Sequence, residues 1–90
     1  MAEMKDFPVG ILVKECSPYT NRAKYGRVRK AYRQCWGEPL NETVIILQCD
    51  TVKANGTPVL RGSDHRVIVR DSDDIKADKH GVIVINRNLN

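Results

Sequence analysis

The sequence predicts a mainly β domain in which about five short, mostly antiparallel strands close into a small barrel. Two observations predict this class. β-Branched and aliphatic residues gather in short runs, and turn-forming residues separate those runs at intervals of roughly 8 to 12 residues. Because 90 residues bury only one modest core, residues 1–90 are expected to form a single domain with flexible ends at residues 1–7 and 87–90.

Four of the strands follow from their own side chains. GILVKEC alternates along its length, TVIILQCD is the strongest β signal, and HRVIVRD and GVIVINR complete the set. The acidic cluster DSDDIKAD, residues 71–78, lies between the last two segments and is predicted to form a solvated turn, because the spacing of a calcium-binding loop is absent. The four predicted strands cover residues 10–16, 43–50, 65–71 and 81–87.

The turn after residues 43–50 is predicted from Asn55-Gly56. This dipeptide favours the positive φ values of a type I′ hairpin turn. Pro58 lacks a backbone donor, so it restricts the returning strand to a sheet edge or an irregular beginning. The sequence therefore predicts a hairpin with Asn55-Gly56 at its tip.

Residues 21–36 fit two different elements. As a strand, they place Val28 and Tyr32 on one face, although Lys30 breaks this alternation. As an amphipathic helix, they would produce an α+β fold in which the basic helix packs on an antiparallel sheet. The strand is favoured because Gly26 inside a helix would cost about 1 kcal/mol relative to Ala. In the strand, the opposite face carries Arg27, Arg29 and Arg33.

Basic residues are concentrated in this same segment. Residues 22–33 carry six of them and no acidic residue, whereas the rest of the chain has nine basic and eleven acidic residues. A basic stretch on a slightly acidic body attracts a polyanion. The candidate binding residues are Arg22, Lys24, Arg27, Arg29, Lys30 and Arg33.

Two functions are consistent with this charge distribution. The first is non-enzymatic binding to the phosphates of RNA or DNA, which positions the ligand without reading its sequence. The alternative is a protein-binding adaptor or inhibitor that docks its basic face on an acidic partner, as in a transcription, translation or phage-host complex. Aromatic residues that could stack on unpaired bases are Tyr25, Tyr32 and Trp36, unless at least two of them fill the core.

Other features argue against catalysis, a cofactor or a metal. Asp64 and His65 are adjacent, so on a strand they point to opposite faces and do not readily form an acid–base pair. The sequence has neither a phosphate-cradling glycine loop nor paired ligands at metal-binding spacing, so we expect no enzymatic activity, no cofactor and no metal. Three widely spaced cysteines are predicted to be free thiols, namely Cys16, Cys35 and Cys49.

The sequence also indicates a location away from membranes. The first ten residues carry charges where a secretory signal would be apolar. No apolar run approaches the roughly 20 residues of a membrane helix. A cytoplasmic protein without membrane contact is therefore expected.

The order GILVKEC, the polar loop SPYTNRAKY, then GRVRKAY leading into VIILQCD, with a glycine before the second strand, resembles the beginning of a KOW-type domain. HRVIVRDSDDIK is similar to the place where SH3-like barrels make a short 3₁₀ turn before their last strand. The resemblance spans roughly residues 9–86 and implies a five-stranded SH3-like barrel that contacts nucleic acid, ribonucleoprotein or, in some members, protein alone. This sequence departs from the family pattern in its basic loop before Gly26 and in Lys30, where an apolar residue is more typical.

Overall fold

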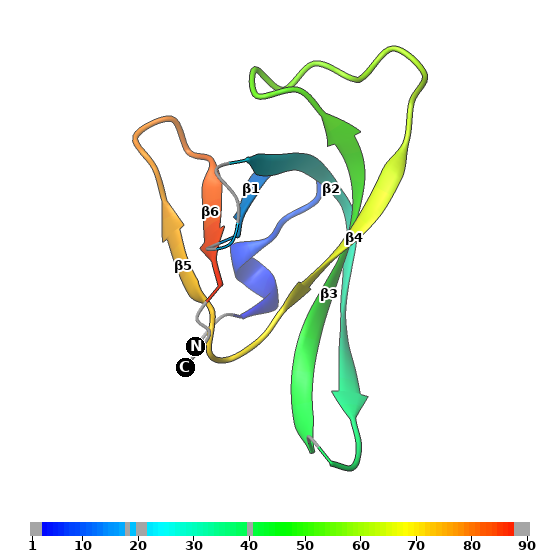
Figure 1. Ribbon diagram of the computed structural model, residues 1–90, viewed down its shortest axis with the longest axis vertical. Helices are drawn as coiled ribbons and strands as arrows, with labels where there is room; N and C mark the ends of the chain where they lie inside the picture. Colours follow the sequence, from blue (N-terminus) through cyan, green and yellow to red (C-terminus); the bar gives the residue numbers. More distant parts are fainter. Residues whose placement is uncertain (1–2, 18, 20–21, 40, 88–90) are drawn as a thin grey trace.

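Two long strands form the largest part of the fold. β2 runs over Ala23–Trp36 and β3 over Glu42–Val52, and the two pair antiparallel. Figure 1 shows β2 curving away from β1 into the hairpin that it forms with β3. Residues 23–36 therefore form the predicted strand, and the helix alternative for them is wrong. β3 pairs with β2 along most of its length and β1 pairs with its first five residues, so hydrogen bonds between strands outweigh the middling local propensity of β2 for a strand.

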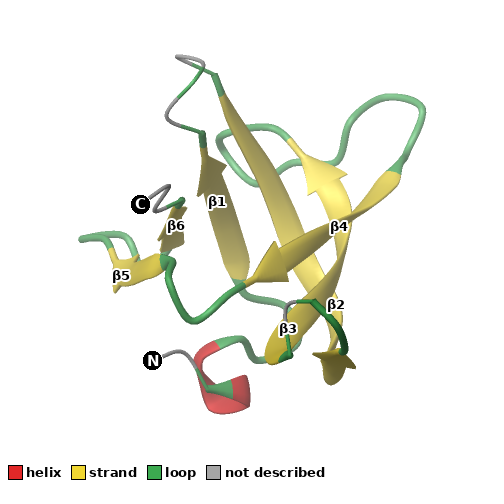
Figure 2. Cartoon of the chain, turned by 60° about the horizontal axis from the view of Figure 1, so that its bottom comes forward, coloured by secondary structure: helices red, strands yellow, loops and turns green. Residues whose placement is uncertain are grey.

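The computed structural model describes residues 3–17, 19, 22–39 and 41–87. Six strands in these residues hydrogen-bond into one sheet, in the order β4-β3-β2-β1-β6-β5 (Figure 1, Figure 2). The mainly β class is confirmed, but this sheet is open, with β4 and β5 as its edges, where a closed barrel of about five strands was predicted. The remaining elements are the 3₁₀ helix η1 (Met4–Asp6), β1 (Leu12–Cys16), β4 (Asp64–Val69), β5 (Asp74–Ala77) and β6 (Ile83–Asn86).

The extra strand, β5, lies inside residues 71–78, which the sequence predicts to be a turn. It pairs antiparallel with β6. The two are joined by a tight turn in which the backbone N–H of Gly81, at a φ of 80°, donates to the carbonyl oxygen of Asp78 (3.1 Å). β6 in turn pairs parallel with β1. Because Ile75 is the one β-branched residue of β5, local alternation could not reveal this short, charged edge strand.

A β-bulge interrupts the pairing of β2 with β3 between Val28 and Lys30. Val28 pairs with Cys49 and Lys30 pairs with Gln48, so Arg29 is an extra residue without a partner position on β3. An extra residue reverses the faces of all positions that follow it. The bulge therefore decides which side chains of β2 meet the core.

The predicted faces of β2 are wrong beyond this bulge. Arg33 pairs with Ile45, which belongs to the core, whereas Tyr32 pairs with Ile46 on the opposite face. Tyr32 thus does not share the face of Val28, and Arg33 does not share the face of Arg29. The physical reason is the inserted residue, since uninterrupted alternation would have kept the predicted sets together.

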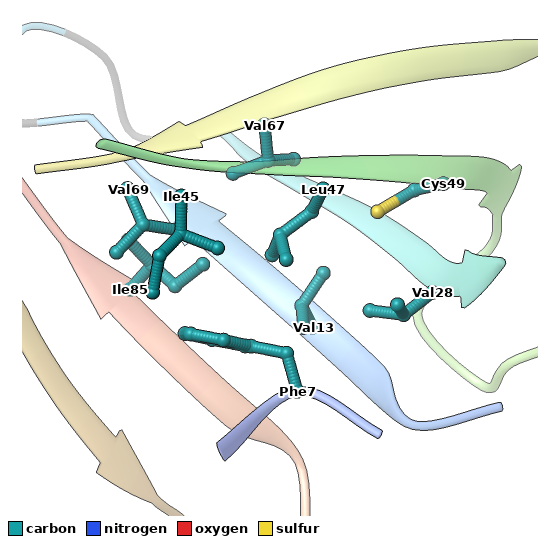
Figure 3. Close-up of a cluster of buried hydrophobic side chains, with 9 residues drawn as sticks. All are labelled: Phe7, Val13, Val28, Ile45, Leu47, Cys49, Val67, Val69 and Ile85. Atoms are coloured by element: carbon teal, nitrogen blue, oxygen red, sulfur yellow. The ribbon is translucent and has the colours of Figure 1, made fainter. Parts of the chain in front are cut away.

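The core lies between the two halves of the curved sheet (Figure 3). Side chains from β1, β2, β3, β4 and β6 point toward one another there, together with Phe7, which follows η1 and is only 2% exposed. Phe7 therefore belongs to the packed fold, contrary to the expectation of a flexible end at residues 1–7. The buried cluster consists of Phe7, Val13, Val28, Ile45, Leu47, Cys49, Val67, Val69 and Ile85.

Arg87 links the two halves of the sheet at one side of this core. Its guanidinium donates to the backbone oxygen of Ile68 in β4, to the carboxylate of Asp73 at 2.6 Å, and to the carboxylate of Glu15 in β1. The Asp73 side chain is only 3% exposed, so it is not part of a solvated turn. Arg87 likewise does not belong to a free end, because three separate segments hold it; residues 88–90 lie outside the described residues.

The connection from β3 to β4 turns at Asn55-Gly56, but the turn is not the predicted type I′. The N–H of Gly56 donates to the carbonyl oxygen of Lys53 (2.8 Å), and the N–H of Lys53 donates to that of Thr57 (2.9 Å). Gly56 has a φ of 87°, whereas Asn55 has no positive φ. This geometry is a loop of three residues closed by a left-handed glycine. Pro58 then forms an isolated bridge to β3 before the chain reaches β4.

We predict that Arg87→Met lowers the free energy of unfolding by roughly 3 kcal/mol, because it leaves two carboxylates without their shared cation. Arg87→Lys keeps the charge without the planar fork and should fall between this variant and the wild type. Urea denaturation measures the differences. Arg61→Met, at an exposed position, is the control and should stay within about 0.5 kcal/mol of the wild type. An equally small effect of Arg87→Met would contradict the stabilising role of the contacts that Arg87 makes between the two halves of the sheet.

Gly26→Ala should destabilise the fold by roughly 1 to 3 kcal/mol through overpacking. An added Cβ would lie 2.7 Å from the Cβ of Cys49 and 3.0 Å from Cε1 of His65. Gly37→Ala is the matched control, since no atom of the described residues, other than its chain neighbours, lies within 4 Å of its added Cβ. Thermal unfolding followed by circular dichroism compares the two variants, and similar melting temperatures would show that the contacts around Gly26 can yield.

Candidate functional site

The face of β2, β3 and β4 that points away from the core, called here the outer face, carries two adjacent cross-strand rows. Lys30, Gln48 and Arg66 are neighbours across the three strands and form the polar row. Tyr32, Ile46 and Ile68 form the next row, called the apolar row. Side chains that pair across strands lie on the same face, so the cations of the first row border the ring of the second.

Arg29 joins the polar row because it is the extra residue of the bulge. Its side chain is 61% exposed and forms an ion pair with Asp50 on β3 at 3.4 Å. A pocket of about 290 Å³ next to it is lined by Arg29, Gln48, Cys49, Asp64, His65 and Arg66. Two guanidinium groups from different strands therefore border one concave surface, together with an amide that can donate and accept hydrogen bonds.

All three candidate aromatic residues lie on this outer face, Tyr32 and Trp36 beyond the bulge and Tyr25, which pairs with Val52, before it. Tyr32 is half-buried, with the Nζ atom of Lys30 5.7 Å from its ring centroid, and Trp36, also half-buried, pairs with Glu42. Tyr25 is half-buried at the other end of β2, where Lys14 lies 5.9 Å from its ring centroid. None of the three rings belongs to the buried cluster, so the interpretation that at least two fill the core is wrong. Phe7 supplies the aromatic volume of the core instead.

The other basic candidates do not gather on one surface. Arg27 donates to the backbone oxygens of Gly10 (2.8 Å) and Gly56 (3.1 Å), so its guanidinium fastens the β3–β4 turn to the segment before β1. Arg33 lies on the core side of the sheet, where it lines a different pocket. Lys24 pairs with Glu15 of β1, and Arg22 is exposed just before β2. The structure therefore brings Arg29 and Lys30 together and separates the rest.

Two residues of the polar row, Gln48 and Arg66, were not predicted from the sequence. Alternation in HRVIVRD does place Arg66 on the face opposite Val67 and Val69, which is a usable local signal. The alternation does not indicate which strand pairs with this segment. Only the pairing of β4 with β3 brings Arg66 beside residues of β2.

The described residues contain no group of three or more His, Cys, Asp or Glu side chains that could hold a metal ion, and no helix among them is long and apolar enough to cross a membrane. The three cysteines are free thiols, as predicted. Burial, with smaller contributions from Glu15 and Asp50, raises the pKa of the Cys49 thiol to about 11, so this thiol stays protonated at neutral pH. Comparison with protein-family models, curated proteins and solved structures finds no match to this chain.

His65 lies on the core side of β4, opposite the outer face. Its Nδ1 atom is 2.7 Å from the hydroxyl of Thr51, and its Nε2 atom is buried without a hydrogen-bond partner among the described residues. The ring fits there because Gly26 has no side chain. A protonated ring would carry a second N–H with no acceptor.

Burial lowers the pKa of His65 below its usual value of 6.5. Lys24 adds to this effect, and Glu15 and Asp64 oppose it. As the pH falls below about 6.5, the unfolded chain binds a proton at this position before the folded protein does. The neutral ring therefore stabilises the fold above this pH, and the contribution is lost as the pH falls toward the lowered pKa.

We predict that His65→Gln removes this pH dependence. The free energy of unfolding of the wild type should decrease between about pH 7.5 and about pH 5, and that of the variant should decrease less. Urea titrations at several pH values measure both. His80→Gln, at an exposed position in the β5–β6 turn, should behave as the wild type does. Parallel curves for wild type and His65→Gln would contradict the assignment.

Proposed function

We propose that this domain binds nucleic acid without catalysis, through phosphate contacts from Arg29, Lys30 and Arg66 on the outer face. The observation that supports this proposal is the bulge, which turns Arg29 to the side of the sheet where Arg66 of β4 and Lys30 of β2 border the same row. Cations from two strands can contact successive phosphates of one chain. A ligand held by phosphates alone is bound with little regard to its sequence.

The cations are accessible to a ligand at small cost. The side chain of Arg66 makes no ion pair or hydrogen bond within the part of the chain that the structure describes, and the residue is exposed. Arg29 is paired with Asp50, but both side chains are more than half exposed, and such surface pairs contribute only about 0.2 to 1 kcal/mol. A phosphate that accepts two parallel hydrogen bonds from a guanidinium offers a stronger interaction.

Two carboxylates border the polar row on one side. Asp50 and Asp64 are direct cross-strand partners, two residue positions beyond Gln48 and Arg66 and on the same face. Asp50 is paired with Arg29 in the free protein, but once Arg29 binds a phosphate both carboxylates are without this cation, and together they repel phosphate. The ligand is therefore expected to extend from the polar row toward Tyr32 and not toward this acidic pair.

The resemblance to KOW-type domains implies the same class of ligand, and the sequence argument for a polyanion agrees with it. An acidic protein surface is the other polyanion that fits a row of cations. The experiment below distinguishes the two, since carboxylates on a protein do not replace an oligonucleotide in a direct binding assay.

The double variant Lys30→Gln, Arg66→Gln should weaken binding to mixed-sequence oligonucleotides at least roughly tenfold at low salt, because each contact to phosphate is charge-assisted. The plot of log affinity against log salt should become shallower by about 0.7 per lost contact for a single strand or about 0.9 for duplex DNA. Asp64→Asn should act in the opposite direction and tighten binding. Fluorescence anisotropy with labelled RNA and DNA between about 50 and 200 mM salt measures these effects.

Lys79→Gln is the matched control, because it removes one exposed cation in the β5–β6 turn, across the sheet from β4. It should bind as the wild type does. If the wild type binds neither RNA nor DNA at the lowest salt, the proposal fails; capture of an acidic protein that depends on Lys30 and Arg66 would then support the adaptor alternative.

A further inference from the structure

We infer that the ligand of the outer face is an unpaired nucleic-acid strand, whose bases stack on Tyr32 and Trp36 while its phosphates contact the polar row. This inference rests on the proposed function and specifies its ligand. The observations that carry it are the two half-buried rings of the outer face beyond the bulge, their spacing, and the charges on each side of them.

The spacing of the rings fits an extended strand. Tyr32 and Trp36 are four residues apart on β2 beyond the bulge, so they lie on one face at a separation of roughly 13 Å along the strand. Neighbouring bases of a regular helix are only about 3.4 Å apart along the axis. Two rings at the larger spacing cannot both serve adjacent stacked bases. They can serve two bases of a strand that is pulled out along the sheet, as in other single-strand-binding surfaces.

A duplex does not satisfy these rings. Paired bases expose their edges in the grooves, while their faces are covered by neighbouring pairs. The apolar row consists of a ring beside two isoleucines, of which Ile46 is 3% exposed, and its one polar group is the hydroxyl of Tyr32, which is too little to read the base edges in a groove. Such a surface matches the face of an unpaired base and not the edge of a paired one.

The ammonium group of Lys30 can interact either with the ring of Tyr32 or with a phosphate of the ligand. In the free protein its ammonium lies over the ring of Tyr32, an interaction that at exposed sites changes an equilibrium by about two- to fivefold. Stacking of a base on an aromatic ring changes it by about five- to 150-fold. A base can therefore displace the ammonium, which then lies one row away from the ring and is free to pair with a phosphate.

The charges beyond the polar row and beside Trp36 determine toward which end of the outer face the bound nucleic-acid strand extends. The acidic pair Asp50 and Asp64 lies on the far side of the polar row from Tyr32. Toward Trp36, the carboxylate of Glu42 is neutralised by Arg70 at 2.5 Å. A polyanion that takes Arg29 away from Asp50 is therefore repelled by the acidic pair in one direction and meets the neutralised carboxylate of Glu42 in the other.

The experiment compares a mixed-sequence single strand with the duplex of the same sequence, as RNA and as DNA. Trp36 is the only tryptophan, so its fluorescence reports directly on base stacking in the wild-type protein. We expect the single strand to quench this fluorescence and to bind at least about tenfold more tightly than the duplex. The affinity should also rise with oligonucleotide length until both rings are spanned.

Variants of the rings complete the test. Tyr32→Leu should weaken single-strand binding about tenfold, with the salt dependence unchanged because no phosphate contact is lost. Tyr32→Phe should restore the affinity, and Tyr25→Leu, which removes the ring at the other end of β2, is the matched control. If the protein binds neither the single strand nor the duplex, the proposed function itself is refuted. Equal or tighter duplex binding, or single-strand binding that neither quenches Trp36 nor responds to Tyr32→Leu, would overturn this inference and leave phosphate binding in place.

Discussion

The arrangement of this domain depends on the single residue that β2 carries in excess of β3. A bulge bends its strand and increases the local twist, and here it lies where β2 passes from its partner β1 into the long hairpin with β3. It also reverses the faces of all later residues of β2. Without it, Tyr32 would point into the core and Ala31 away from it. The core and the outer face are therefore two consequences of one local irregularity.

A second constraint holds the bent sheet together. An open, strongly curved sheet leaves a seam between its halves, and Arg87 crosses this seam by bonding to β4, to β1 and to the chain before β5. A guanidinium suits this position because its planar fork can satisfy several acceptors at once. One of the two carboxylates, that of Asp73, is almost fully buried. The interaction with Arg87 therefore mainly offsets the cost of burying this charge and adds little net stability.

The same irregularity explains why the basic segment is not a single binding surface. Alternation, bulge and pairing distribute its cations over both faces, and one of them, Arg27, holds two backbone carbonyls. What remains on the outer face is a smaller group, which gains Arg66 from β4. Its position beside an accessible ring is what distinguishes it from the many solvated cations on the surface of a small protein. Charge density along the chain is thus a poor guide to charge density in space.

The sequence by itself determined the β class, the positions of β1, β2, β3, β4 and β6, and the presence of free thiols, because these depend on residues one or two positions apart. It also held one sign of the bulge, since Lys30 breaks the alternation of Val28 and Tyr32. Only the tertiary structure decided the strand order, the parallel pairing of β1 with β6, the short strand β5, and which residues lie beside Arg66 on the outer face. Each of these depends on hydrogen bonds between segments far apart in the chain, and a local sequence pattern does not determine which distant segments pair.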